Sequence, residues 1–194
     1  MLLFISVAVV ILTGLGIYYY LSEDLPKIAS LSDYRPPSIT AVYSDDNRKI
    51  AEFYKERRIV VPLAKIPTRL TEAFIAAEDA RYFKHQGIDF LSIVRAFFKN
   101  LEAGAIVQGG STITQQVTKS FLLTPERSYT RKIREAILAY RIDKTFSKDE
   151  VLEMYFNLLN YGHLAYGPEA AAQVYFGKAA AELTPAEATL LAGI

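Results

Sequence analysis

Glu78 is the side chain whose surroundings best suit acid–base chemistry. Leu70, Phe74 and Tyr82 stand at helical spacing around it, so its carboxylate is expected to project from an apolar stripe of the helix. Burial in such a stripe disfavours the charged form of a carboxylate and raises its pKa, which suits proton transfer near neutral pH. An ion pair with Arg81 at the end of a helix explains the same pattern equally well, and both interpretations stay open.

Residues 109–116 form a second segment with the chemistry to bind a ligand. Gly109 and Gly110 allow the backbone to approach a ligand closely. Thr112 and Gln115 have the spacing of a capping box, so a helix is expected to begin here with exposed backbone N–H groups that favour an anion. An ordinary capped surface helix is the simpler interpretation. The side chains expected to face solvent or ligand are Thr112, Gln115, Gln116 and Lys119.

A third candidate site is a group of basic residues around one acid. Arg131 and Lys132 lie one helical turn before Glu135, so the three side chains can share a helix face. With Lys119 and Arg127 they offer guanidinium forks and ammonium charges that match pyrophosphate oxygens. Glu135 would hold these cations in place or share a metal with them. A solvated face with intrahelical ion pairs is the alternative.

The scaffold that positions these residues is predicted to be mainly α-helical behind a small β element. Helical spacing begins after Pro67, and further capping boxes start at Ser147 and Thr184. Residues 39–43 and 49–54 predict a β-hairpin, and residues 59–61 are expected to add a third strand. Residues 90–107 carry Phe97 and Phe98, which we expect either in the core or on a membrane surface as an interfacial helix.

The first 21 residues carry no charged side chain, although the chain of 194 residues has 22% charged residues and a net charge of +1. A bilayer core needs about 20 apolar residues in a helix, so residues 1–21 are expected to be a transmembrane anchor, followed by a linker over 22–38. A signal peptide is the weaker interpretation, because no basic region precedes the apolar run. The net charge argues against nucleic acid as a partner. The sequence stops within an apolar helical pattern, so the domain over 39–194 is expected to be truncated.

Four segments, in this order, resemble the glycosyltransferase domain of class A penicillin-binding proteins and of monofunctional peptidoglycan glycosyltransferases. They are EDARYFKHQG (78–87), GSTITQQ (110–116), RKIRE (131–135) and KDEVLEMYFN (148–157). The resemblance covers roughly residues 41–194. Tyr82 and Phe83 stand in the reverse of the usual order, Phe156 replaces a usual Leu and Asp143 a usual Glu, and the fifth block of the family is missing.

The resemblance implies a lysozyme-like fold and a substrate, lipid II, that is a disaccharide-peptide on a polyprenyl pyrophosphate. Glu78 would be the general base that activates a sugar hydroxyl of the acceptor, while Glu135 and Lys132 would serve the pyrophosphate. The resemblance leaves Mg²⁺ open as a cofactor. The other residues that it places at the substrate are Asp79, Ser111, Thr112, Gln115, Gln116, Lys119, Arg127, Arg131 and Asn157.

The implied location is the bacterial inner membrane, with one anchor and the catalytic domain on the extracytoplasmic side. The implied partners are lipid II, the growing glycan strand and other proteins of cell-wall synthesis. Two alternatives remain: a lysozyme-like enzyme that cleaves glycan, and a membrane-tethered module that only binds it. The basic residues around Glu135 argue against cleavage, because breaking a glycosidic bond releases no pyrophosphate.

Overall fold

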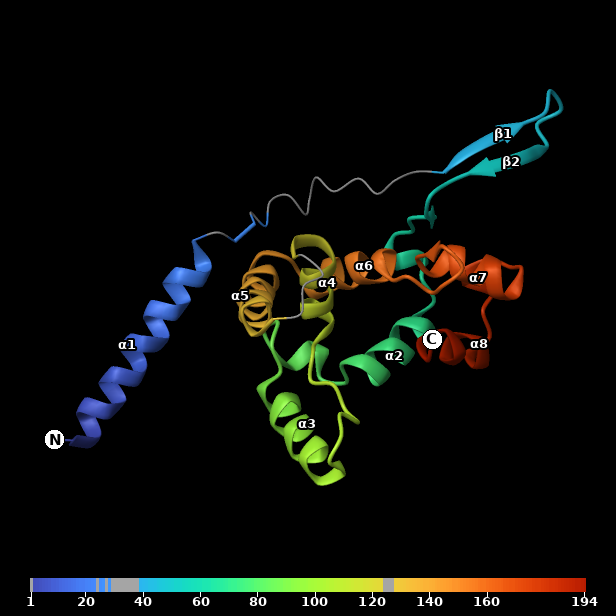
Figure 1. Ribbon diagram of the computed structural model, residues 1–194. Helices are drawn as coiled ribbons and strands as arrows, with labels where there is room; N and C mark the ends of the chain where they lie inside the picture. The colour runs from blue at the N-terminus through green and yellow to red at the C-terminus, as the bar shows by residue number, and fades with distance from the viewer. Residues whose placement is uncertain (1, 24, 27, 29–38, 124–127) are drawn as a thin grey trace.

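A computed structural model describes residues 2–23, 25, 26, 28, 39–123 and 128–194. The described chain is mainly helical, as the sequence predicts; helices α2 to α8 gather in one body, and most of α1 stands apart from it (Figure 1). The α-helices are α1 (Leu2–Ser22), α2 (Thr68–Glu78), α3 (Phe90–Ala103), α4 (Ile113–Leu122), α5 (Tyr129–Thr145), α6 (Lys148–Leu158), α7 (Pro168–Phe176) and α8 (Pro185–Ala192). Short 3-10 turns cover Leu63–Lys65, Tyr82–Lys84 and Ala180–Glu182.

The predicted hairpin is confirmed. Strands β1 (Thr40–Tyr43) and β2 (Lys49–Phe53) pair antiparallel, with Thr40 opposite Phe53. The turn between them closes with a hydrogen bond of 3.0 Å from the Asn47 N–H to the Ser44 carbonyl. The hairpin extends beyond the helical body (Figure 1).

The predicted third strand at residues 59–61 is wrong. The strand is β3 (Arg57–Arg58), and it pairs in parallel with β4 (Ala165–Tyr166) instead of joining the hairpin. The following residues need no strand partner, because the Asn157 side chain accepts from the Val61 N–H at 3.0 Å and donates to the Val61 carbonyl at 2.9 Å. A side chain of α6 therefore takes the place of a neighbouring strand.

The core lies between α2, α4, α6 and the two C-terminal helices. Phe74, one turn before Glu78, packs edge-to-face against three aromatic rings, with centroid distances of 6.1 Å to Tyr155, 5.2 Å to Phe156 and 5.9 Å to Tyr161. Each such pair contributes about 0.5–1.5 kcal/mol beyond the burial of its area. The end of α2 is therefore held firmly by the core below it.

The capping boxes that the sequence predicts all form. In each, the side chain of the first residue accepts a hydrogen bond from a backbone N–H of the helix. The side chain three residues later accepts one from the backbone N–H of that first residue. Pro168 and Pro185 occupy first turns, and Gly177 ends α7 in a left-handed conformation. The boxes pair Thr112 with Gln115, Ser147 with Glu150 and Thr184 with Glu187.

Helix α3 leaves its apolar face uncovered. Asp89 caps its start by accepting from the backbone N–H groups of Leu91 at 3.1 Å and Ser92 at 3.2 Å. Phe97 and Phe98 are both 62% exposed, so they lie outside the core. We call the most exposed apolar side chains of this helix the α3 face; they are Phe90, Leu91, Val94, Phe97, Phe98 and Leu101.

Helix α1 covers the segment that the sequence assigns to a membrane anchor. The C-terminal end of α1 contacts α5, where the Arg141 guanidinium donates to the Tyr18 hydroxyl at 3.4 Å. In the part of the chain that the structure describes, no helix has the length and apolar character needed to cross a membrane. The predicted transmembrane helix over residues 1–21 is therefore not supported.

Candidate active site

Glu78 is the last residue of α2, and its carboxylate accepts a hydrogen bond of 2.7 Å from the Gln116 side-chain amide. The expected burial of Glu78 is wrong, because the residue is exposed. Leu70 and Phe74 do point into the core, but eight residues carry a helix about 80° beyond a whole number of turns. Glu78 therefore turns out of the apolar stripe, and the helix ends at once because Asp79 leaves helical geometry with φ −153° and ψ 69°.

Three adjoining cavities form a groove around Glu78. The first, about 560 Å³, is lined by Glu78, Ser111 and Gln116 together with residues of α3 and the loop before α4. A wider cavity of about 1010 Å³ shares Ser111 with it, and a third of about 390 Å³ shares Gln116. Glu78 thus lies between two arms of one groove. We call them the cationic arm, lined by Lys119, Arg131 and Lys132, and the aromatic arm, lined by Phe121, Tyr155 and Tyr166.

The cationic arm is organised by Glu135, which is 2% exposed. One carboxylate oxygen accepts from the Arg131 guanidinium at 2.8 Å and the other pairs with the Lys132 ammonium. Lys132 also donates to the Ser111 hydroxyl at 2.8 Å. The prediction that these side chains share a face is confirmed, and the result is a fixed group of positive charges suited to a phosphate. Arg127 lies outside the described residues.

Thr112 and Gln115 were expected to face solvent or ligand; the structure buries both, and only Thr112 lines the cavity of Glu78. Both are 2% exposed. The Thr112 hydroxyl donates to the Gly87 carbonyl at 2.6 Å and accepts from the Gln115 N–H at 3.1 Å. The Gln115 side chain accepts from the Thr112 N–H at 3.0 Å. The capping box is thus used to fasten α4 to the loop that follows Glu78.

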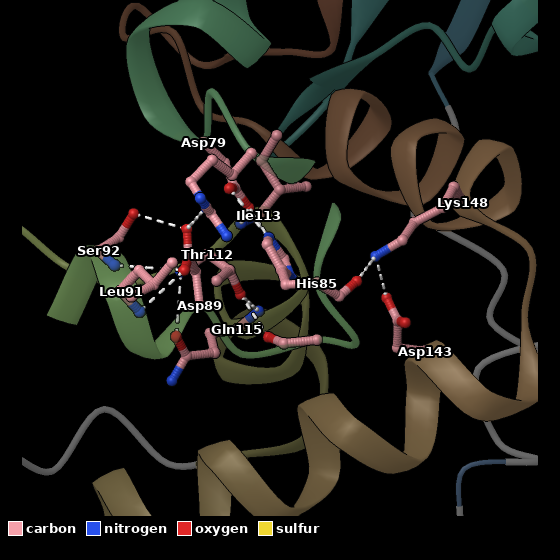
Figure 2. Close-up of polar contacts among 12 residues, drawn as sticks. Asp79, His85, Asp89, Leu91, Ser92, Thr112, Ile113, Gln115, Asp143 and Lys148 are labelled. Carbon is pink, nitrogen blue, oxygen red and sulfur yellow. Dashed lines mark hydrogen bonds and ion pairs between the residues drawn. The ribbon is translucent and has the colours of Figure 1, made fainter. Parts of the chain in front are cut away.

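The start of α4 is not an open anion site either, because Asp79 occupies it. The Ile113 N–H donates to the Asp79 carboxylate at 3.1 Å, and the His85 Nε2 lies 3.0 Å from both oxygens of the same carboxylate (Figure 2). Asp79 is 7% exposed. The residue next to Glu78 therefore joins the end of α2, the start of α4 and the loop through His85.

Asn157 lies apart from the groove. Besides its bonds to Val61, its side-chain amide donates to the Glu153 carbonyl at 2.9 Å, so its polar atoms serve the backbone. The structure thus brings together Glu78, Ser111, Gln116, Lys119, Arg131 and Lys132, with Glu135 and Asp79 directly behind them. It places Gln115 and Asn157 in the framework, whereas Thr112 belongs to the framework and also lines the cavity of Glu78.

The sequence of residues 46–194 matches the transglycosylase family, and the match includes every described residue of the groove. The chain belongs to the transglycosylase family. Three relatives named penicillin-binding protein 1A are similar to it. The protein of Rickettsia bellii is 48% identical over 96% of this chain, that of Escherichia coli 46% over 92%, and that of Vibrio cholerae 43% over 94%. The chain spans 24%, 21% and 22% of these relatives.

The structure adds two cations to the groove of this transglycosylase domain that the motifs did not indicate. Arg95 and Lys99 of α3 line the same cavity as Glu78, and both are exposed. They stand four residues apart, on the polar side of a helix whose other side is the α3 face. The four-residue spacing of Arg95 and Lys99 indicates a shared polar face, but it does not indicate that this face borders Glu78.

The Tyr155 hydroxyl stays protonated beside the negative charge of Glu78. Burial raises the pKa of Tyr155, and the charges of Glu78 and then Asp79 raise it further. Tyr155 also lines the aromatic arm, so the groove of the transglycosylase domain has a neutral tyrosine close to Glu78.

A divalent cation does not fit at Glu135. Magnesium takes oxygen ligands with octahedral geometry, but both Glu135 oxygens already accept from cationic side chains. Among the described residues, no group of three or more His, Asp or Glu side chains has the arrangement of a metal site. The contacts of Glu135 fit a carboxylate that holds the two cations in place and not one that shares a metal.

Proposed function

We propose that this transglycosylase domain polymerises lipid II into glycan strands, with inversion at the anomeric carbon and release of polyprenyl pyrophosphate. One observation carries the proposal: the Glu78 carboxylate lies in a groove between the cationic arm and the aromatic arm. A base beside a fixed group of positive charges suits a transfer whose leaving group is a pyrophosphate. The lysozyme-like fold implied by the resemblance belongs to this proposal.

Glu78 acts as the general base. It takes the proton of the acceptor sugar hydroxyl while the hydroxyl oxygen forms a bond to the anomeric carbon of the growing chain. The bond from that carbon to the pyrophosphate oxygen breaks, and its electron pair leaves with the pyrophosphate. The hydrogen bond of 2.7 Å from Gln116 holds the Glu78 carboxylate in the groove, so the base is oriented before the substrate arrives.

The cationic arm stabilises the leaving pyrophosphate. Negative charge on the departing oxygens increases in the transition state, so cations that are already fixed in place favour that state over the bound substrate. Glu135 fixes Arg131 and Lys132, and Ser111 links Lys132 to the cavity of Glu78. Lys119 lines the same arm, and Arg127 joins it on the strength of the sequence alone. Arg95 and Lys99 offer further positive charge in the cavity that contains Glu78.

The remaining predicted residues act by holding the loops of the groove. Asp79 and the Thr112–Gln115 capping box join the loop after Glu78 to α4. Asn157 holds the segment that leads from β3 into α2. Their loss would therefore act on the geometry of the groove, where Asp79 and Thr112 also line the cavity of Glu78.

We also propose that the domain works at the extracytoplasmic surface of a bacterial membrane. A polyprenyl tail stays in the bilayer, and the exposed α3 face offers apolar area for contact with lipid. The anchor is proposed from the sequence of residues 1–21 alone, where no charged side chain occurs. Other proteins of cell-wall synthesis are proposed as partners on the same ground as lipid II, the resemblance.

The test is incorporation of labelled lipid II into polymer, in detergent, by the chain and by Glu78→Gln. A positioned base contributes roughly 100- to 10,000-fold, so Glu78→Gln is expected to lose about that much rate with little change in folding. Glu72→Gln is the matched control, because Glu72 is exposed on the same helix and lines a different cavity.

The same experiment separates the alternatives when products are analysed by length. Polymer from the chain and from Glu72→Gln, but not from Glu78→Gln, supports the transferase and its base together. Shortening of added glycan strands would indicate the lysozyme-like hydrolase instead. Binding of glycan that survives Glu78→Gln, with neither reaction, would leave only the binding module.

A further inference from the structure

Lys148, the first residue of α6, makes three polar contacts beneath the loop that follows Glu78. Its ammonium donates to the His85 carbonyl at 2.8 Å and pairs with the Asp143 carboxylate (Figure 2). It also lies 4.5 Å from the centre of the Tyr82 ring, a distance at which a cation is attracted to the ring face. The side chains of Lys148 and Asp143 are only 23% and 6% exposed, so water screens this pair weakly.

The same residue also holds the loop through its backbone. The Tyr82 hydroxyl donates to the Lys148 carbonyl at 2.7 Å, and Tyr82 is fully buried. Residues 82 and 85 are thus attached to one residue of α6, the first through its hydroxyl and the second through its carbonyl. The short helical turn between them has little freedom to move while both contacts persist.

Two contacts lead from this turn to Glu78. The His85 ring binds both Asp79 oxygens at 3.0 Å, and the Tyr82 N–H donates to the Asp79 carbonyl at 2.9 Å. Asp79 also accepts from the Ile113 N–H at the start of α4, the helix that carries Gln116. A shift of the turn would therefore move Asp79, and with it both Glu78 and the residue that orients Glu78.

We propose that Lys148 is a positioning residue for Glu78, acting through Tyr82, His85 and Asp79. This inference rests on the proposed function of the groove. Lys148 is absent from the linings of the three cavities that form the groove in the described chain. Its loss should therefore change the turnover step more than substrate binding. Misplacement of a catalytic group by about 1 Å costs on the order of 100-fold in rate.

The experiment compares kcat and KM for lipid II between the full chain, Lys148→Met and Lys148→Arg. Methionine keeps much of the length and packing of lysine but removes the charge and the hydrogen bonds. We expect kcat to fall by about 10- to 100-fold with KM within about twofold, and arginine to restore much of the loss. Lys144→Met is the matched control, because Lys144 is exposed near the end of α5, and its kcat is expected to be unchanged.

A double variant tests whether Lys148 acts through Glu78. In the Glu78→Gln background the base is gone, so Lys148→Met is expected to reduce the residual rate little further. The inference would be overturned if the rate losses of the two single variants multiply in the double variant, or if Lys148→Met raises KM and leaves kcat normal. Circular dichroism and thermal melting show whether Lys148→Met folds. Should it not fold, Lys148→Arg and Asp143→Asn carry the test, because Asp143→Asn weakens the ion pair while leaving the bond to His85.

The outcomes also separate this inference from the proposed function. If the full chain forms polymer and Glu78→Gln does not, while Lys148→Met keeps full kcat, only the role of Lys148 fails. If the full chain forms no polymer under any condition, the proposed function fails first. A low kcat in Lys148→Met that arginine does not restore, together with a melting temperature far below that of the control, would assign Lys148 to stability alone.

Discussion

At the scale of single residues, the groove depends on acids in two different environments. Glu78 is exposed and receives one hydrogen bond, whereas Asp79, Asp89 and Glu135 are buried and bind two or more partners. A buried carboxylate without partners would be costly, so these three acids serve best as fixed points for cations and backbone N–H groups. The exposed acid is the one left to contact a substrate.

Asp89 gives a prediction on pH. Burial opposes its charge, but hydrogen bonds from Ser92 and the nearby Arg81 charge outweigh it and hold the pKa of Asp89 below its ordinary value of 3.8. Its stabilising effect is therefore present above pH 3.8 and is lost as the pH falls through the lower, folded-state pKa. Asp89→Asn keeps a capping side chain but removes the charge, so we expect it to be less stable at pH 7 by about 1 kcal/mol.

Urea unfolding of the protein and of Asp89→Asn, at a series of pH values from neutral to acid, measures that difference. The gap between the two proteins should stay constant near neutral pH and narrow only under acid conditions. Asp45→Asn serves as the control, because Asp45 is exposed in the hairpin turn. A gap that widens on acidification would show that the charge of Asp89 destabilises the fold.

At the scale of elements, the helices were predictable because local signals decide where they start. Thr112, Ser147 and Thr184 each stand three residues before a matching Gln or Glu, and each starts a helix. Local signals could not reveal what the capping residues contact. The burial of Thr112 depends on the Gly87 carbonyl, 25 residues away in the chain. The missed strand at Arg57 likewise depends on a partner near residue 165.

The same division holds for the site: contacts within one helix could be predicted, and contacts between elements could not. The spacing of Arg131, Lys132 and Glu135 is local, and their contacts were inferred correctly. The exposure of Glu78 depends on where the core ends beneath α2, which helical spacing alone does not indicate. Arg95 and Lys99 enter the groove only because α3 lies beside the loop before α4.

The loop after Glu78 gives a prediction at the element scale. Gly87 has φ +80°, and a Cβ at this position would lie 2.4 Å from the Ala139 carbonyl oxygen of α5. Gly104 has φ +63° with no atom within 4 Å of such a Cβ. Gly104→Ala should therefore cost only the left-handed strain, about 1–2 kcal/mol, and Gly87→Ala distinctly more because the loop must leave α5.

Thermal melting of both variants tests this comparison, with activity measured at a temperature where each is folded. We expect Gly87→Ala to lose activity as well as stability, since the Thr112 hydroxyl binds the Gly87 carbonyl and fixes α4. Equal melting temperatures for the two variants would mean that the loop and α5 can separate without cost.

At the scale of the whole molecule, the α3 face predicts attachment to lipid. The chain shortened to residues 22–194 is expected to bind liposomes, and Phe97→Ser with Phe98→Ser to weaken that binding by at least about tenfold, because two exposed aromatic side chains leave the lipid. Tyr43→Ser with Phe53→Ser is the control, as these side chains are similarly exposed on the hairpin. Flotation with liposomes measures the difference, and equal flotation of both variants would contradict a role for α3.

Hydrogen bonds between distant parts of the chain have a consequence for how the domain folds during its synthesis. Arg57 binds the Gln173 side chain at 2.7 Å across 116 residues, and Lys148 reaches back to His85 across 63. Helices can form as the chain leaves the ribosome. A contact of such long range can form only after its C-terminal residue has been synthesised, and it forms slowly. The aromatic arm, lined by Tyr155 and Tyr166, therefore forms only after α6 and β4 have been synthesised, so a nascent chain that ends soon after Glu78 holds no complete groove.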